Sequence, residues 1–202
     1  MFQRPILEFP NSNIKTFIRN RKIENVNCLN SVSSWYNEPN KNFYSVGGVS
    51  RTDIWLSAYT STWMANVYLK FLLPKCLVYS DIVCATMYLY HYANNTNGAN
   101  LNYTIRRLLA DWDYLTLTWN NAPAYSDAYG ITYNLGAIND WHTHDLTAVI
   151  REWVKNIYPN YGVMLKYETP TGYRIDGHLY NHTVPLYRPY LVIETLERQR
   201  RF

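Results

Sequence analysis

The stretch "DWDYLTLTWNNAPAY", residues 111–125, sets an alternating pattern directly before a run of turn-forming residues. Leu115, Leu117 and Trp119 alternate with threonines, which predicts a half-buried β-strand over residues 114–119. The Asn-Asn-Ala-Pro run that follows favours a turn, and its proline has no backbone N–H for a sheet hydrogen bond. We therefore expect the strand to end abruptly and the Trp119 side chain to lie in the core.

The composition of the whole chain agrees with a β-rich fold. The chain has 202 residues, of which 48% are hydrophobic and 17% are charged, so it can bury a core. It contains 20 tyrosines, 7 tryptophans and 6 phenylalanines. Aromatic residues favour strands, and tyrosine suits positions with one buried end and one end in water. We predict an all-β protein with much aromatic surface.

Short strand candidates follow one another at the spacing of a β-sandwich or barrel, and turn-forming residues separate them. No linker composition and no internal repeat interrupts residues 33–197, which indicates one domain. The candidates are 43–47, 53–58, 64–72, 82–92, 101–109, 114–119, 131–137, 162–167, 173–180 and 189–196.

One segment predicts a short helix instead of a strand. "DLTAVIREWVKN" has Val149, Ile150 and Trp153 at helical spacing, and Asp145 or Thr147 can cap its start. Proline and glycine in the following "IYPNYG" cannot continue a helix. We expect this helix to pack across one end of the sandwich, with Trp153 as its buried anchor.

The two ends of the chain differ from the central domain. Residues 1–32 have a β-leaning alternation without glycine, which predicts an extended arm that either lies on its own domain or adds a strand to the exposed sheet edge of a neighbouring subunit. Residues 198–202 form a basic tail. The arm residues expected to take part in assembly are Phe17, Ile18, Ile23, Val26 and Cys28.

Three cysteines leave at least one unpaired within the chain, and none has a zinc-site spacing. Cys84 lies in a strand candidate and is interpreted as a small buried hydrophobe. Cys28 lies in an extended polar stretch, so it is a candidate for a disulfide between two chains; a free thiol without a role is the alternative.

The charge pattern argues against nucleic-acid binding. The formal net charge is +4, and many of the basic residues lie near the two ends instead of forming a stripe over the folded body. No apolar run approaches the ~20 residues of a membrane-spanning helix. The first residues contain two prolines and a glutamate, and they have no continuous apolar segment typical of a secretory signal.

The residues that could carry chemistry are few. His142 and His144 lie close together in "WHTHD", and His178 and His182 lie near each other. Neither pair has an identifiable third metal ligand, because Asp145 is better used at the start of the helix. No nucleophile elbow, P-loop or zinc-binding helix is present in the sequence. We predict a protein that is not an enzyme, with no metal and no cofactor.

Three long motifs carry a family resemblance: "LLADWDYLTLTWNNAPAY", "WHTHDLTAVIREWVKNIYPNYGVMLKYE" and "RPYLVIETLE". Together they resemble the DNRLRE-type domain, a jelly-roll β-sandwich of bacterial surface proteins that is also classed with carbohydrate-binding modules. The resemblance covers residues 33–197 and implies a jelly-roll fold. The positions expected to have structural roles are Trp112, Trp119, Asn120, Asn121, Pro123, Asp145, Trp153, Gly162 and Pro189.

Two functional hypotheses follow. The first is a non-enzymatic structural subunit of a bacterial surface or spore-surface assembly, which associates with itself through the arm and lies outside the cell without a recognisable signal peptide. The alternative is a carbohydrate-binding module or adhesin. Its candidate glycan-binding residues are Tyr125, Asp127, Tyr129 and Tyr133, because aromatic faces stack on sugars and polar groups bind hydroxyls. A virus or phage fibre domain is a third interpretation.

Overall fold

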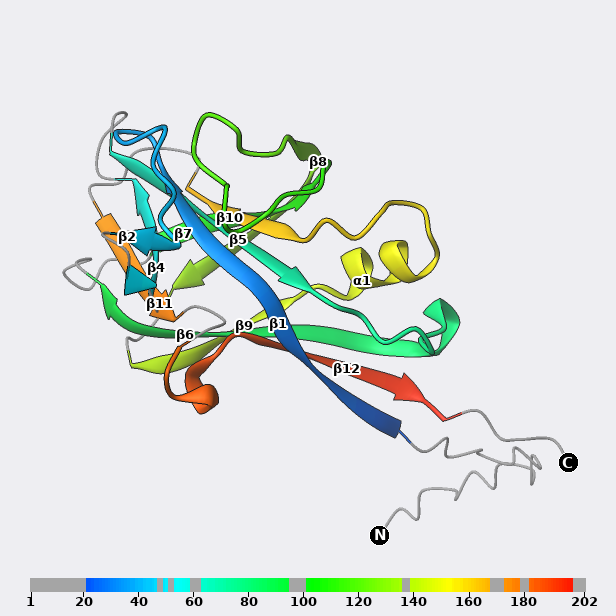
Figure 1. Ribbon diagram of the computed structural model, residues 1–202. Helices are drawn as coiled ribbons and strands as arrows, with labels where there is room; N and C mark the ends of the chain where they lie inside the picture. Colours follow the sequence, from blue (N-terminus) through cyan, green and yellow to red (C-terminus); the bar gives the residue numbers. More distant parts are fainter. Residues whose placement is uncertain are drawn as a thin grey trace, which may run out of the picture.

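The computed structural model describes residues 21–46, 49–50, 53–58, 63–94, 101–135, 139–167, 173–178 and 182–197 (Figure 1). The chain is mostly β-structure with one short α-helix. The strands are β1 (Arg21–Trp35), β2 (Ser45–Val46), β3 (Val49–Ser50), β4 (Asp53–Ala58), β5 (Met64–Phe71), β6 (Ile82–Asn94), β7 (Leu101–Leu108), β8 (Tyr125–Leu135), β9 (Asp140–Asp145), β10 (Val163–Lys166), β11 (Tyr173–His178) and β12 (Tyr190–Leu196). The helix is α1 (Thr147–Val154), and two 3₁₀ turns are η1 (Tyr79–Asp81) and η2 (Pro185–Tyr187).

Ten of the strands in the described ranges form one curled antiparallel sheet. Nine follow the order β1-β12-β6-β11-β4-β5-β10-β7-β8, and β9 pairs with β6. β1 pairs with β12 through residues 21–27 and with β5 through residues 28–35, so it runs from one layer of the sheet to the other. The sheet therefore folds over on itself, which confirms the predicted all-β, sandwich-like class.

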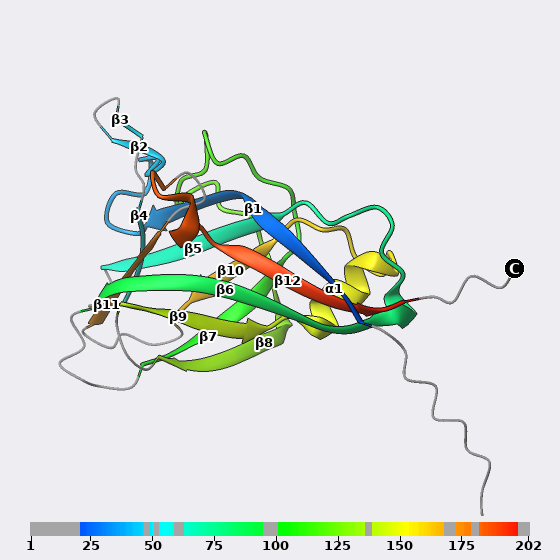
Figure 2. The same ribbon diagram turned by 90° about the horizontal axis from the view of Figure 1, so that it is seen from below.

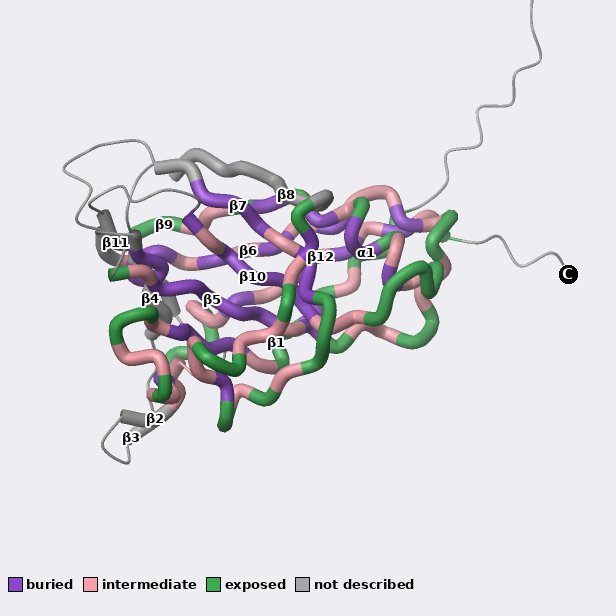
Figure 3. The backbone as a smooth tube through the Cα atoms, turned by 90° about the horizontal axis from the view of Figure 1, so that it is seen from above, coloured by how far each residue is buried: buried purple, intermediate pink, exposed green. Residues whose placement is uncertain are grey.

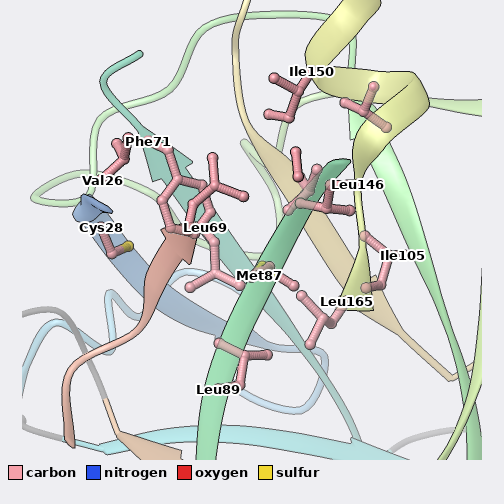
Figure 4. Packing of buried hydrophobic residues seen from close by; sticks show 14 of the residues in the cluster. Val26, Cys28, Leu69, Phe71, Met87, Leu89, Ile105, Leu146, Ile150 and Leu165 are labelled. Carbon is pink, nitrogen blue, oxygen red and sulfur yellow. The ribbon is translucent and has the colours of Figure 1, made fainter. Parts of the chain in front are cut away.

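The core lies between the two layers of this sheet (Figure 4). Alternate residues of each strand point inward: Met87 and Leu89 on β6 meet Leu69 on β5 and Leu165 on β10, and all four side chains are almost inaccessible to water. α1 closes one end of the core with Val149, Ile150 and Trp153, as its helical spacing predicts.

The start of α1 is fixed to β6 by short polar contacts. The Asp145 carboxylate accepts the backbone N–H of Thr147 at 2.8 Å, and the Thr147 hydroxyl accepts the N–H of Ala85 at 2.9 Å. The N–H of Leu146 donates to the carbonyl of Ala85 at 2.8 Å. These bonds position α1 across the end of the sandwich.

The strand predicted over 114–119 is wrong: residues 114–116 form a turn, and residues 117–119 continue as an irregular loop. Polar side chains take the backbone groups that a strand would have paired. The Asp113 carboxylate accepts the N–H of Leu115 at 3.0 Å, and the Asn121 amide oxygen accepts the N–H of Thr118 at 2.6 Å. As a result Leu115 is exposed, and Trp119 is only partly buried.

This turn-rich loop, residues 109–124, covers the outer face of β5, β10 and β7. Its Leu117 side chain is buried in a second apolar cluster with Tyr68, Leu108 and Met164, whose positions alternate with those of the main core. Figure 3 shows the buried stretches of β5, β7 and β10 from this side. The stretch of residues 111–125 therefore mostly forms a loop that packs on the outside of the sheet, and the strand expected within it is not formed.

Several residues expected to be structural hold this loop and its neighbours. The Trp112 indole Nε1 donates to the carbonyl of Tyr161 at 2.7 Å, and the carbonyl of Pro189 accepts the N–H of Cys28 at 3.1 Å. Gly162 has φ +91°, and a Cβ there would lie 2.2 Å from the carbonyl oxygen of Leu69. Pro123 is partly buried in the loop.

The expected arm is in part a strand of this same sheet. The domain boundary expected at residue 32 falls inside β1, and Val26 is buried in the core while Ile23 is 60% exposed. Phe17 and Ile18 lie outside the described residues, and self-association through residues 1–32 stays a prediction.

The position of Cys28 argues against a disulfide between chains through this residue. The side chain is 7% exposed, and its thiol lies 3.2 Å from the carbonyl oxygen of Asn30. Burial raises the pKa of the Cys28 thiol to about 12, so it stays protonated at neutral pH and is a poor nucleophile. A second chain could reach it only after β1 separates from the core.

Candidate functional site

The outer face of β9, β6 and β12 carries a group of aromatic side chains. Met87 and Leu89 of β6 point into the core, so Tyr88 and Tyr90 point outward. Tyr88 pairs with Tyr190 of β12, and Tyr90 pairs with Trp141 of β9. Because directly paired residues share a face of the sheet, the register gathers these four rings on one outer surface. Figure 2 shows β12, β6 and β9 side by side.

The rings brace one another through defined contacts. Tyr88 and Tyr190 stack with centroids 4.7 Å apart and planes within 3°. Trp141 reaches over β6 and lies edge-to-face with Tyr190 at 5.1 Å and with Tyr90 at 5.4 Å. Tyr187 of η2 packs against Tyr90 at 4.6 Å. We call these five partly buried residues, Tyr88, Tyr90, Trp141, Tyr187 and Tyr190, the aromatic platform.

Polar side chains flank the platform on both sides. Asn27 of β1 pairs with Tyr190, Asn25 lies two residues away on the same face, and Thr143 of β9 pairs with Tyr88. All three are exposed. In the part of the chain that the structure describes, these three side chains, the hydroxyls of Tyr88 and Tyr190, and the indole Nε1 of Trp141 have no hydrogen-bond partner. They are therefore available to a ligand.

The platform itself is uncharged. The pKa of Tyr190 is raised, mainly by burial and to a smaller extent by the neighbouring Tyr88. The phenol of Tyr190 therefore keeps its proton and can donate a hydrogen bond. Farther along β12 the Glu194 carboxylate is neutralised by Arg21 at 2.9 Å. Such a surface suits a ligand with both apolar faces and hydroxyl groups.

The glycan-binding residues predicted from the sequence do not belong to the platform. Tyr125 lies at the start of β8, with the Arg106 guanidinium 5.6 Å and the Lys166 ammonium 5.3 Å from its ring centre. Asp127 is highly exposed and lies 3.5 Å from Arg106. Tyr129 and Tyr133 are in β8, and their side chains lie outside the described part. The ring of Tyr125 is already in contact with two of the protein's own cations.

The paired histidines of "WHTHD" are on the inner face of β9. His144 is buried, and its Nε2 lies 2.9 Å from the Tyr103 hydroxyl. The His142 ring lies 4.7 Å from that of His91. Among the residues described, no group of three His, Cys, Asp or Glu side chains could hold a metal ion, and no helix is long and apolar enough to cross a membrane.

Trp141 and Tyr190 were missed because the platform depends on register. The alternation of Tyr88 and Tyr90 in "MYLYHY" is visible in the sequence, but the polar "DWHTHD" is not an obvious strand. A strand assignment for residues 140–145 would have placed Trp141 and Thr143 on one face.

The fold and the platform together define a β-sandwich with an uncharged, partly exposed aromatic surface on one outer face. The family model of carbohydrate-binding module family 96 matches residues 32–195, and the chain belongs to this family. Carbohydrate-binding modules are typically non-catalytic. The family match agrees with the resemblance to a carbohydrate-binding module that the sequence motifs indicated over residues 33–197. A search of curated proteins gave no match.

Proposed function

We propose that this chain is a non-catalytic carbohydrate-binding module that holds a glycan on the aromatic platform. One observation carries the proposal: braced aromatic rings lie beside hydroxyl, amide and indole groups that have no partner among the described residues. Family membership supports the same function. It favours this alternative over a structural subunit.

The platform suits a sugar for two physical reasons. The C–H faces of a pyranose ring can stack on Trp141, and the sugar hydroxyls can bond with Asn25, Asn27 and Thr143. The contacts of Trp141 with Tyr88, Tyr90 and Tyr190 hold the indole in one orientation, which lowers the entropy cost of binding.

The proposal predicts that Trp141→Ala weakens glycan binding by about tenfold or more, the equivalent of about 1.4 kcal/mol. Binding can be measured by affinity electrophoresis in xylan, mannan, mixed-linkage β-glucan and polygalacturonate, and by pull-down on cellulose and chitin. Tyr79→Ala is a matched control, because Tyr79 is 46% exposed on η1 and lies outside the platform. Equal binding by Trp141→Ala and the wild type would exclude the platform as the site.

The predicted group around Tyr125 remains a second candidate surface for the same function. Its cations, Arg106 and Lys166, would favour an acidic glycan. In the assay above, retention of the wild type only in polygalacturonate, unaffected by Trp141→Ala, would support this surface instead of the platform.

A further inference from the structure

We infer that the module has a second binding site for a neutral glycan, formed by Tyr36, Trp119, Asn40 and Asn120. This inference rests on the proposed function and adds a separate site to it. Tyr36 comes directly after β1 and is 42% exposed, while Trp119 and Asn120 belong to the loop of residues 109–124. The Tyr36 and Trp119 rings lie edge-to-face, with centroids 5.4 Å apart and planes at 86°.

Backbone and amide contacts hold the two halves of this site together. The N–H of Asn120 donates to the carbonyl of Pro39 at 3.0 Å, and the Asn120 side-chain amide donates to the Asn40 amide oxygen at 2.8 Å. The N–H of Tyr36 donates to the carbonyl of Met64 at 2.9 Å. Segments about eighty residues apart in the sequence are therefore fixed side by side before any ligand binds.

These contacts leave several polar groups available. Within the described ranges, the Tyr36 hydroxyl, the Trp119 indole Nε1, the side-chain NH₂ group of Asn40 and the Asn120 amide oxygen have no hydrogen-bond partner. They place hydrogen-bond donors and acceptors beside the exposed aromatic ring of Tyr36. A sugar, with its apolar ring faces and hydroxyls, matches this combination.

The charges nearby indicate a neutral ligand. The Lys41 ammonium lies 2.5 Å from the Glu38 carboxylate, and it also lies over the Phe43 ring at 5.2 Å. This pair has no net charge. A carboxylated or sulfated glycan would therefore find no unpaired cation to bind at this site. It would have no electrostatic advantage over an uncharged oligosaccharide.

The second site lies on the opposite outer face from the platform. The loop that contains Trp119 covers the outside of β5, β10 and β7, whereas the platform lies outside β6 and β12, with the core between them (Figure 1). β1 borders both, with Asn27 beside the platform and Tyr36 at the other site. Nine residues of extended chain separate them by roughly 30 Å. One module would thus bind two glycan chains and bridge them.

The decisive measurement is the number of ligands per chain. Isothermal titration with the hexasaccharides of β-1,4-linked glucose, xylose and mannose, on a chain shown to be monomeric by light scattering, should give two binding events for at least one of them. Tyr36→Ala and Trp141→Ala should each reduce this number to one, and the double variant should not bind. Tyr79→Ala should keep both events, and circular dichroism should show that each variant is folded.

The outcomes separate the second site from the proposed function. A single binding event that Trp141→Ala abolishes and Tyr36→Ala leaves intact overturns the second site but keeps the platform. Two events that both survive Tyr36→Ala also overturn it. No binding of any of the three hexasaccharides by the wild type overturns both sites for neutral glycans.

Discussion

His144 is a buried base in the layer directly beneath the platform. Its side chain is 3% exposed on the inner face of β9, next to Tyr103 and the ring of His142. Burial, with a smaller contribution from His142, lowers the pKa of His144 from 6.5 to about 3. The folded protein therefore keeps this imidazole neutral under conditions in which an unfolded chain would protonate it.

This pKa difference predicts a loss of stability in mild acid. The contribution of neutral His144 is complete above pH 6.5 and decreases as the pH falls from 6.5 toward 3, because only the unfolded chain then binds the proton. At pH 5 the loss should be about 2 kcal/mol. Urea unfolding at pH 7.5 and pH 5 should show this loss for the wild type and a smaller one for His144→Gln, with His182→Gln as the control. The same pH dependence in His144→Gln and the wild type would contradict it.

At the scale of elements, Asn121 holds the loop of residues 109–124 in its turns. Its amide oxygen accepts from the N–H of Thr118 at 2.6 Å and from the Thr118 hydroxyl at 3.1 Å, and its amide N–H donates to the carbonyl of Thr116 at 2.9 Å. The neighbouring Asn120 bonds outward to Asn40. Two adjacent asparagines thus have different partners, one inside the loop and one between loops.

Asn121→Ala should therefore destabilise the fold by about 1–3 kcal/mol, because three hydrogen bonds within the loop are lost. The free energy of unfolding in urea measures the change. The matched control is Asn37→Ala, because Asn37 is exposed and lies outside the loop of residues 109–124. A loss below about 0.5 kcal/mol would mean that the turns form without this side chain.

Local patterns predicted the elements whose side chains follow one period. The spacing of Val149, Ile150 and Trp153 indicated α1, and alternation indicated β5 and β6 close to their observed bounds. The segment 114–119 has equally good alternation, but Asp113 and Asn121 satisfy its backbone locally. The platform was not predictable from any single strand, because it depends on how β9 and β12 align with β6.

At the scale of the whole molecule, β1 joins the two layers of the sandwich. Its first half pairs with β12 and its second half with β5, and the register shifts between Cys28 and Asn30 where the strand passes from one to the other. The family match begins at residue 32, inside this strand. A domain cut at that position would separate the half of β1 that pairs with β12 from the rest of the fold.

Two truncations test this role of β1. A chain that begins at Arg21 retains all of β1 and should unfold cooperatively at the same urea concentration as the full chain. A chain that begins at Ser33 loses the pairing with β12 and removes Val26 and Cys28 from the core. Burial of each such side chain contributes about 1.5–3 kcal/mol, and total stability is typically only about 5–15 kcal/mol, so this chain should be unfolded or aggregated. If circular dichroism and urea unfolding show that it is as stable as the chain from Arg21, the sandwich closes without the first half of β1, and residues 21–32 are then free to act as the separate arm that the sequence predicted.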